Sequence, residues 1–262
     1  MDDSIIKSKE EAKNLLILAT LAGQIMLKSG AETYRVEDTI IRVCKSKRNI
    51  EFAEAFVIPT GIFISIEFED DFMSYIKRIK NISPDLNKID MVNEFSRRFV
   101  SDNLNIDDSF KHLKEINKYS LYSNKTRNLF GAIACGFFAL LYKGQLLDGL
   151  SSFISSFVAL SVVRKFSKYR LTFFLNNVVG SMIISVLAVF SIRLGIGINL
   201  DKIIIGAIMC LVPGLSITNA VRDTMSGDYL SGLSIGLEAI FSAISIAIGV
   251  GIVLSFYSKG GF

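Results

Sequence analysis

The chain has 262 residues, of which 50% are hydrophobic and only 21% charged, and its mean hydropathy is +0.44. Residues 1–125 carry 19 Lys and Arg against 20 Asp and Glu, whereas residues 126–262 carry 10 against 5. Because the net charge of +4 arises in the apolar half, these numbers indicate a soluble domain joined to a membrane domain and argue against a nucleic-acid-binding surface.

The cysteines give no support to metal or disulfide chemistry. Cys44, Cys135 and Cys210 are widely spaced, and His112 is the only histidine. This spacing fits neither a zinc site nor a disulfide framework, so we expect free thiols, no metal and no cofactor. The chain begins with an acidic MDDS, which is not typical of a cleaved signal peptide, and we expect residues 1–125 to stay in the cytoplasm.

Residues 1–125 have the pattern of a mixed α and β domain. An apolar helical repeat from Leu15 precedes Gly30, which stands where a helix C-cap glycine is expected. Two β runs, 52–58 and 62–68, flank a Pro-Thr-Gly turn and predict a hairpin. The other expected elements are a helix from Thr33, a third strand over 74–80, a helix capped by Ser83 with Pro84 at its first position, and a helix from Asp107 or Asp108 to about 119.

Residues 126–262 contain five segments that approach or exceed the roughly 20 apolar residues needed to span a membrane. These segments are 127–142, 145–163, 171–192, 203–221 and 229–257. The expected fold is therefore an α-helical membrane protein with about five transmembrane helices, preceded by a soluble α+β cytoplasmic domain.

Basic residues near the predicted spans indicate the orientation, because cytoplasmic loops are enriched in Lys and Arg. With the N-terminus inside, eight such residues lie on the cytoplasmic side and four outside, and the cluster RKFSKYR at 164–170 contributes most. We expect a multi-pass protein of the inner membrane whose N-terminus is cytoplasmic.

The segment VPGLSITNAVRDTMSG, residues 212–227, interrupts the fourth predicted span. Pro213 lacks a backbone donor and Gly214 loosens the chain, so the span should be kinked or broken at this pair. A broken helix exposes backbone groups that can bind a solute.

Asn219, Arg222 and Asp223 follow this break at spacings of three and four residues, which places them near one face or edge of a helix. Two interpretations stay open. The side chains line a cavity at membrane depth, where charged groups are costly, or they lie just outside the span and pair with each other or with Asp228. Polar residues in other predicted spans favour the cavity: Asp148, Asn176, Asn177 and Glu238. We expect Asn176 and Asn177 to help bind the solute, and Asp148 and Glu238 to serve either in coupling or as structural polar residues.

A second charged cluster lies at the start of the helix expected from Thr33. Glu32, Arg35 and Glu37 belong to it, and acidic side chains there stabilise the helix dipole. The alternative is that the cluster docks on a cytoplasmic loop such as 164–170 and couples the domain to the membrane helices.

The motifs VPGLSITNAVRDTMSGDYLSG and SGAETYRVEDT together resemble the N-terminal component of the threonine/serine exporter family, which includes two-component dicarboxylate (succinate) exporters. The resemblance covers essentially the whole chain. It implies a secondary exporter made of two related parts, in which this chain needs a separate, smaller membrane subunit. We therefore expect the chain to form an oligomer. Family features carry over to Gly30, Ala31, Glu32, Glu37, Pro213, Gly214, Asn219, Ala220 and Asp223.

One position departs from the pattern that the resemblance implies. Ile235 stands where an arginine is expected, which leaves Arg222 as the main candidate for binding a substrate carboxylate. Asn219 and the backbone near Pro213 and Gly214 would complete its hydrogen bonds, and Asp223 or Glu238 would carry a coupling proton.

The alternative function is a membrane-anchored enzyme or sensor whose activity lies in the soluble domain. Against an enzyme, the only match to a nucleophile motif is GLSIG at 232–236, which lies in an apolar helix without the strand-turn-helix that the motif needs. We therefore expect a transporter subunit for a small carboxylate-bearing metabolite, and no nucleic-acid partner.

Overall fold

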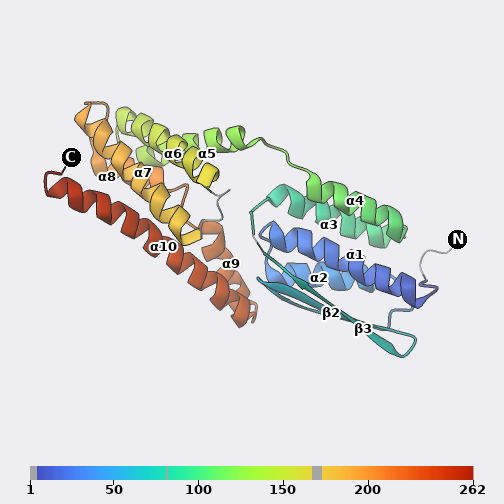
Figure 1. Ribbon diagram of the computed structural model, residues 1–262. Coiled ribbons are helices and arrows are strands. Elements are labelled where there is room, and N and C mark those ends of the chain that lie inside the picture. The colour runs from blue at the N-terminus through green and yellow to red at the C-terminus, as the bar shows by residue number, and fades with distance from the viewer. Residues whose placement is uncertain (1–4, 81, 167–172, 262) are drawn as a thin grey trace. The chain divides into compact units, whose positions relative to one another are not determined.

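The computed structural model describes residues 5–80, 82–166 and 173–261, and these residues are mostly helical with one three-stranded sheet (Figure 1). The chain divides into two compact units. Unit 1 comprises residues 1–121 and 217–236, and unit 2 comprises residues 122–216 and 237–262.

Unit 1 begins with two helices, continues with an antiparallel sheet and ends its first segment with two more helices. These elements are α1 (Lys9–Lys28), α2 (Thr33–Cys44), β1 (Phe52–Ile58), β2 (Gly61–Phe68), β3 (Asp71–Arg78), α3 (Leu86–Ser101) and α4 (Ile106–Lys118). Ser8 caps α1 by accepting a hydrogen bond from the amide of Glu11 at 3.2 Å. Gly30 follows α1 with φ +84°, a left-handed conformation that favours glycine, which confirms its predicted place after the helix.

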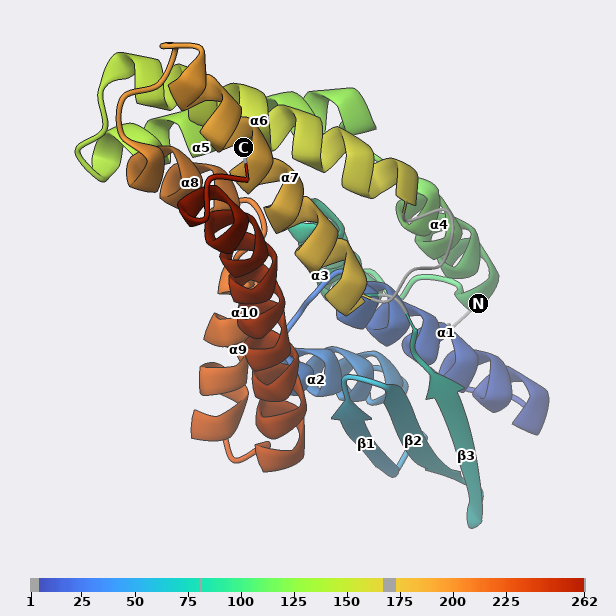
Figure 2. The same ribbon diagram turned by 60° about the vertical axis from the view of Figure 1, so that its left-hand side comes forward.

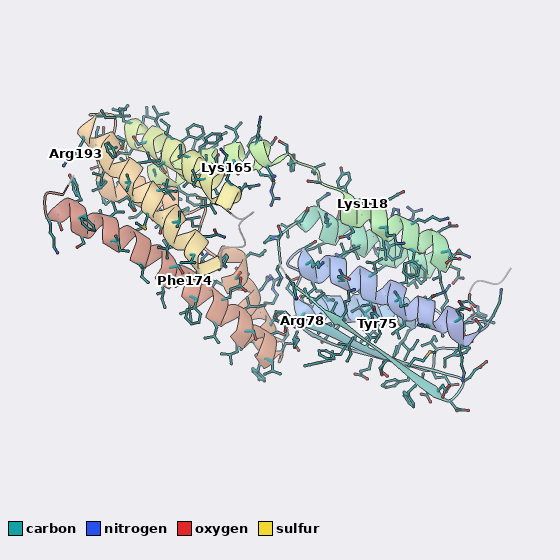
Figure 3. The ribbon with its side chains drawn as sticks, viewed as in Figure 1. Tyr75, Arg78, Lys118, Lys165, Phe174 and Arg193 are labelled. Carbon is teal, nitrogen blue, oxygen red and sulfur yellow. The ribbon has the colours of Figure 1, made fainter. Side chains whose placement is uncertain are left out.

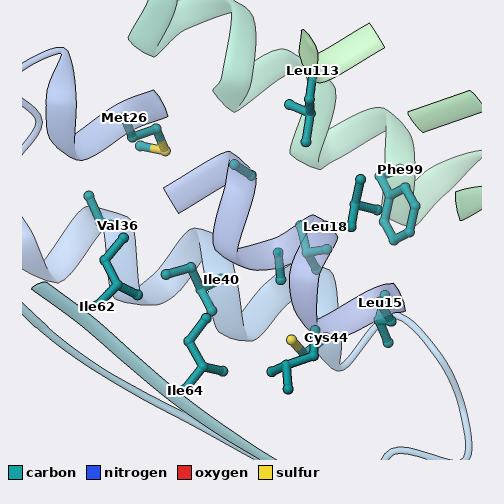
Figure 4. Packing of buried hydrophobic residues seen from close by; sticks show 14 of the residues in the cluster. Leu15, Leu18, Met26, Val36, Ile40, Cys44, Ile62, Ile64, Phe99 and Leu113 are labelled. Carbon is teal, nitrogen blue, oxygen red and sulfur yellow. The ribbon is translucent and has the colours of Figure 1, made fainter. Parts of the chain in front are cut away.

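The sheet has the strand order β1-β2-β3, and its two faces differ in burial. Ile62, Ile64 and Ile66 of β2 point to the buried face, because side chains alternate along a strand. The helices α1 and α2 cover this face (Figure 1). Figure 4 shows the resulting core, to which labelled side chains of α1, α2 and β2 contribute: Leu15, Leu18, Val36, Ile40, Ile62 and Ile64.

The predicted hairpin is confirmed, whereas the third strand has different bounds from those predicted. The third strand begins at Asp71 rather than at Ser74 and ends at Arg78, because Glu69 and Asp70 adopt positive φ (52° and 63°) and form a two-residue turn. Such turns match the twist of the flanking strands and close a hairpin at Phe68 and Asp71.

The prediction that Ser83 caps a helix with Pro84 at its first position is wrong. Helix α3 begins at Leu86, and Asp85 is its N-cap, with a side-chain oxygen that accepts from the amide of Lys88 at 3.3 Å. Aspartate is an N-cap residue at least as good as serine. The next helix, α4, has Asn105 as its cap and places Asp107 and Asp108 in its first turn.

Unit 2 contains long apolar helices that approach one another closely. Its helices are α5 (Asn124–Leu141), α6 (Leu146–Phe166), α7 (Phe173–Arg193) and α8 (Leu200–Ile208). A Cβ built on Gly206 of α8 would lie 2.6 Å from the Cβ of Ala139 in α5, so only glycine allows this approach.

Two further helices, α9 (Gly214–Met225) and α10 (Tyr229–Ser258), belong to both units, because the division passes through them before Ile217 and after Gly236. The chain turns between α8 and α9 at residues 209–213, so the break predicted at Pro213 and Gly214 is confirmed. Thus the fourth predicted span is two short helices rather than one.

Three helices of the described chain are long and apolar enough to cross a membrane: 146–165, 173–193 and 229–258. The last has 30 residues, so it is about 45 Å long, whereas a hydrocarbon core is about 30 Å thick. Its first eight residues belong to unit 1 and the remaining 22, about 33 Å long, belong to unit 2. The division of α10 therefore leaves in unit 2 a length that matches the hydrocarbon core.

Candidate functional site

The two sequence motifs meet in unit 1, where α9 packs beside the loop between α1 and α2. The side-chain amide of Asn219 donates to the backbone carbonyl of Gly30 at 3.0 Å. One turn further along α9, Arg222 forms an ion pair with Glu32. Asn219, Ala220 and Asp223 are buried, so this face of α9 is the packed one.

Glu32 is the centre of a small network of charges. Its side chain is only 8% exposed; one carboxylate oxygen bonds Arg222 and the other accepts from Arg35 at 3.2 Å. Burial opposes ionisation of Glu32, but its backbone hydrogen bond and the charges of Arg35 and Arg222 outweigh burial and lower its pKa. The carboxylate therefore stays ionised and holds both guanidinium groups.

Three more carboxyl groups gather beside Thr33, the first residue of α2. The Thr33 hydroxyl donates to Asp228 at 3.4 Å, and Glu37 accepts from the amide of Val57 at 2.8 Å. Burial raises the pKa of Glu37, and the nearby charges of Asp228 and Asp223 add to this effect. Because like charges repel, it is unfavourable for the carboxyl groups of Glu37, Asp223 and Asp228 all to be ionised at once.

Asp223 is the most deeply buried of these groups, with no exposed side-chain area. Within the described residues, neither of its carboxyl oxygens has a hydrogen-bond partner of normal geometry. Burial raises its pKa, an effect that the neighbouring Thr33 hydroxyl and amide partly oppose and that the charges of Asp228 and Glu32 strengthen. A buried carboxyl without donors is more stable in its neutral form, so Asp223 can take up and release a proton.

The other face of α9 lines an open groove. Its lining residues form two rows with a spacing of four: Ile217, Val221 and Met225 are apolar, and Thr218, Arg222 and Ser226 are polar. The side chain of Arg222 is half exposed, so its guanidinium belongs both to the network with Glu32 and to this groove. A guanidinium offers five donors in a planar fork that matches a carboxylate. The groove can therefore bind a small molecule that carries a carboxylate and a hydroxyl.

The predicted polar residues of unit 2 lie in separate hydrogen-bonded groups. Asp148, at the start of α6, is buried and accepts from the amides of Gln145, Ile198 and Asn199 and from the Asn199 side chain, at 2.7–2.9 Å. These four donors tie the loop before α8 to α6, which fits the structural alternative for Asp148.

Asn177 of α7 is buried and donates to the hydroxyl of Ser242 in α10 at 2.9 Å, so it joins these two helices. The side-chain oxygen Oδ1 of Asn176 is buried and has no hydrogen-bond partner among the described residues. Glu238 is exposed. Pro213 lies in unit 2 at the turn before α9, and Gly214 is the first residue of α9. The roles predicted for all these residues stay predictions.

The docking predicted for Glu32, Arg35 and Glu37 involved the loop at 164–170. Most of that loop lies outside the described residues. Within unit 1, Glu32 bonds Arg222 and Glu37 bonds β1 through Val57, and the predicted docking on 164–170 stays a prediction.

Several members of this site were not identified from the sequence. Asp228 was considered only as a partner of Arg222 and Asp223, and Thr33 was not considered. Both residues lie inside the two motifs, but nothing local in the sequence shows that they face one another. The polar row at positions 218, 222 and 226 could have been found from its spacing of four. No cluster of three His, Cys, Asp or Glu that could hold a metal exists within the described part of the chain.

Comparison with known proteins gives one match. A family model described as putative threonine/serine exporter, ThrE, matches residues 17–257, which include both motifs and every residue of the site. No curated protein and no solved structure matches the chain.

Proposed function

Because this chain belongs to the family of putative threonine/serine exporters, we propose that it is a subunit of a secondary transporter that moves a small carboxylate-bearing metabolite out of a bacterial cell. The family and the three long apolar helices make the chain a membrane protein of an exporter family. Beyond this, we propose a substrate site, a residue that carries the coupling proton, a membrane topology and a partner subunit.

The observation that carries the proposal is the position of Arg222. It joins the two motifs through Glu32 while half of its side chain remains in the open groove of α9. In the proposed mechanism the substrate carboxylate binds Arg222 and competes with Glu32 for its donors. The hydroxyls of Thr218 and Ser226 bind the substrate's hydroxyl, which favours threonine or serine over a dicarboxylate such as succinate.

Asp223 is the proposed proton carrier. It lies one residue after Arg222 on α9, is fully buried, and has its pKa raised mainly by burial. Asn219 holds α9 against Gly30 while Asp223 changes protonation. Binding of the substrate carboxylate at Arg222 releases Glu32 from that ion pair, and the less compensated charge of Glu32 favours protonation of Asp223.

The residues of unit 2 are proposed to build the rest of the path. Backbone groups at the turn around Pro213 and Gly214, with Asn176 and Asn177 of α7, are proposed to bind the solute at membrane depth. Asp148 holds the turn before α8, and Glu238, exposed near the point where α10 leaves unit 1, is the second candidate for the coupling proton.

The proposed topology places unit 1 in the cytoplasm and unit 2 in the inner membrane. The excess of basic residues on the expected cytoplasmic side supports this orientation. The 22 residues of α10 in unit 2 are long enough by themselves to cross the hydrocarbon core, so the eight residues of α10 in unit 1 are not needed for the crossing. A separate, smaller membrane subunit of the same family is the proposed partner that completes the path.

Efflux measurements test the substrate site. Cells that express the chain together with the proposed smaller membrane subunit are loaded with labelled threonine, serine or succinate, and efflux is followed for Arg222→Gln and Arg35→Gln. Both residues pair with Glu32, but only Arg222 lines the groove.

We expect Arg222→Gln to abolish efflux and Arg35→Gln to retain most of it. Ser226→Ala should reduce efflux of threonine and serine more than efflux of succinate. Full efflux by a normally expressed Arg222→Gln protein would contradict the proposed site.

A further inference from the structure

The strand β3 forms an edge of the sheet that the described residues leave open. Its only neighbouring strand is β2, and Figure 2 shows β3 at the side of the sheet opposite to β1. Phe72 and Ile76 are 64% and 67% exposed, although both are large and apolar. An open, apolar edge strand presents unpaired backbone groups that can pair with another chain.

The other edge of the same sheet is protected. At β1, the amide of Val57 donates to the carboxylate of Glu37, and its carbonyl accepts from the hydroxyl of Ser231 at 3.4 Å. These two side chains occupy backbone groups that a further strand would use. The two edges therefore differ, and only β3 keeps the features of a strand that awaits a partner.

The charges of β3 divide between its two ends. Asp71 is the first residue of the strand and follows Glu69 and Asp70 in the turn, whereas Lys77 and Arg78 lie at the end of the strand. Figure 3 labels Arg78 at this basic end and Tyr75 in the strand. An antiparallel copy of the same strand would bring each acidic end beside a basic end, so the edge is complementary to itself in charge.

We propose that β3 pairs antiparallel with β3 of a second copy of this chain, about a two-fold axis at Ser74, and joins the two sheets into one of six strands. In an antiparallel pair, two directly opposite residues point to the same face of the sheet. When the two strands are copies of one another, the residue numbers of every opposite pair add up to the same value. With Ser74 opposite itself, Asp71 lies opposite Lys77 and Phe72 opposite Ile76, and each of these pairs occurs twice.

The alternative two-fold register, centred on Tyr75, is much less favourable. It would place Phe72 opposite Arg78, Met73 opposite Lys77 and Asp71 opposite Ile79, so within the strand no acidic residue lies opposite a basic one. Opposite charges and aromatic with β-branched side chains are stabilising cross-strand pairs. The register at Ser74 provides both kinds of pair, and the central position holds a small side chain.

Asp71 already forms an ion pair with Lys9 of its own chain, but both side chains remain about 60% exposed. Such an exposed pair contributes little stability, so it does not prevent Asp71 from pairing across the interface.

A cysteine at the two-fold axis tests the register. In the full chain with Cys44, Cys135 and Cys210 replaced by alanine, Ser74→Cys should form a symmetric disulfide-linked dimer on mild oxidation in the membrane. Ser65→Cys is the matched control, because the Ser65 hydroxyl lies 3.1 Å from that of Ser74 but on the central strand. The two Ser65 positions would be three strand spacings apart, about 14 Å, which is too far for a disulfide.

Charge reversal tests the same contact by another measurement. Lys77→Asp should weaken the dimer about 5- to 20-fold, because two attractive pairs become repulsive. Adding Asp71→Lys to Lys77→Asp should restore it, since the opposite charges are exchanged rather than lost. Leu86→Lys changes an apolar side chain of similar exposure (68%) outside the strand, and it should leave the dimer unchanged.

Dimer formation is measured for purified protein in detergent by light scattering and by the yield of the Ser74→Cys cross-link. Equal cross-linking of Ser65→Cys, no cross-link at Ser74→Cys in a folded protein, or a link from Ser74→Cys to a different protein would each overturn the proposal. A dimer seen by light scattering in a Ser74→Cys protein that gives no cross-link would also overturn it, because the contact would then lie on another surface.

Discussion

The side-chain amide of Asn219 donates to the backbone carbonyl of Gly30 at 3.0 Å, although the two residues are 189 positions apart in the chain. The carbonyl is available because Gly30 adopts a positive φ just after α1, where the chain leaves the helix. The contact fixes α9 against the loop that also holds Glu32. Asn219, which the sequence predicts to bind the substrate, thus also holds α9 in place within unit 1.

The contact between α9 and α10 depends on the glycine at position 232. A Cβ there would lie 2.9 Å from the carbonyl oxygen of Ala220 and 3.0 Å from the amide of Thr224, both backbone atoms. A Cβ at Gly236 would meet only the Ala220 side chain at 3.8 Å, an ordinary contact.

We therefore expect Gly232→Ala to loosen the contact between α9 and α10, and Gly236→Ala to leave this contact intact. Hydrogen exchange of the α9 amides measures the effect, and it should rise at least about tenfold for Gly232→Ala, as a loss of about 1.4 kcal/mol or more implies. Equal protection in both variants would contradict the close approach.

The ion pair between Arg222 and Glu32 should contribute measurably to the stability of unit 1. Arg222→Ala leaves the buried Glu32 carboxylate with Arg35 as its remaining charged partner, so we expect a loss of about 1–2 kcal/mol in the free energy of unfolding. The loss should be at the lower end because Arg222 is half exposed and water screens it. A double-mutant cycle with Glu32→Gln, followed by urea unfolding in detergent, isolates the pair. A coupling energy near zero would show that the two side chains do not interact.

Asp223 and Glu37 should make the stability of unit 1 fall as the pH rises. Burial is the main cause that raises their pKa values above the ordinary 3.8 and 4.5. A folded state that binds protons more tightly than the unfolded state loses stability with rising pH. Their contribution is therefore fully present below the ordinary values and is lost as the pH rises through the raised values of the folded state.

Asp223→Asn and Glu37→Gln should each reduce this slope above about pH 4.5, where the opposite contribution of Glu32, with its lowered pKa, is already complete. Asp38→Asn changes a carboxyl that is 63% exposed and serves as the control. Urea unfolding at a series of pH values gives the slopes. If neither Asp223→Asn nor Glu37→Gln changed the slope of the wild-type protein, the assignment would be refuted.

Cys44 should be inert to thiol reagents while unit 1 is folded. It is fully buried, and burial raises the pKa of its thiol to about 12. Because the thiolate is the reactive form, iodoacetamide at pH 8 should label Cys44 only after unfolding. Mass spectrometry of labelled peptides with and without urea checks this. Labelling of the native protein at the rate of a free thiol would mean that the core of unit 1 opens readily.

Local sequence signals predicted much of unit 1 and the long helices. The alternation of Ile62, Ile64 and Ile66 indicated a strand with one buried face, and the pair Pro213 and Gly214 marked the break between α8 and α9. These features depend on neighbours within a few residues, so periodicity and backbone chemistry are sufficient to find them. Helix starts were less certain, because several residues near Asp85 can serve as a cap and only the observed hydrogen bond selects one.

The sequence alone determined that two polar motifs exist, that helix-forming apolar segments follow a charged domain, and that the chain resembles an exporter subunit. Only the tertiary structure decided that Glu32 pairs with Arg222, that Thr33 faces Asp228, and that Asp223 is buried without a normal hydrogen bond. The physical reason is that such pairings join residues about 190 positions apart. They depend on how α9 packs against the loop after α1, and no local period in the sequence records that packing.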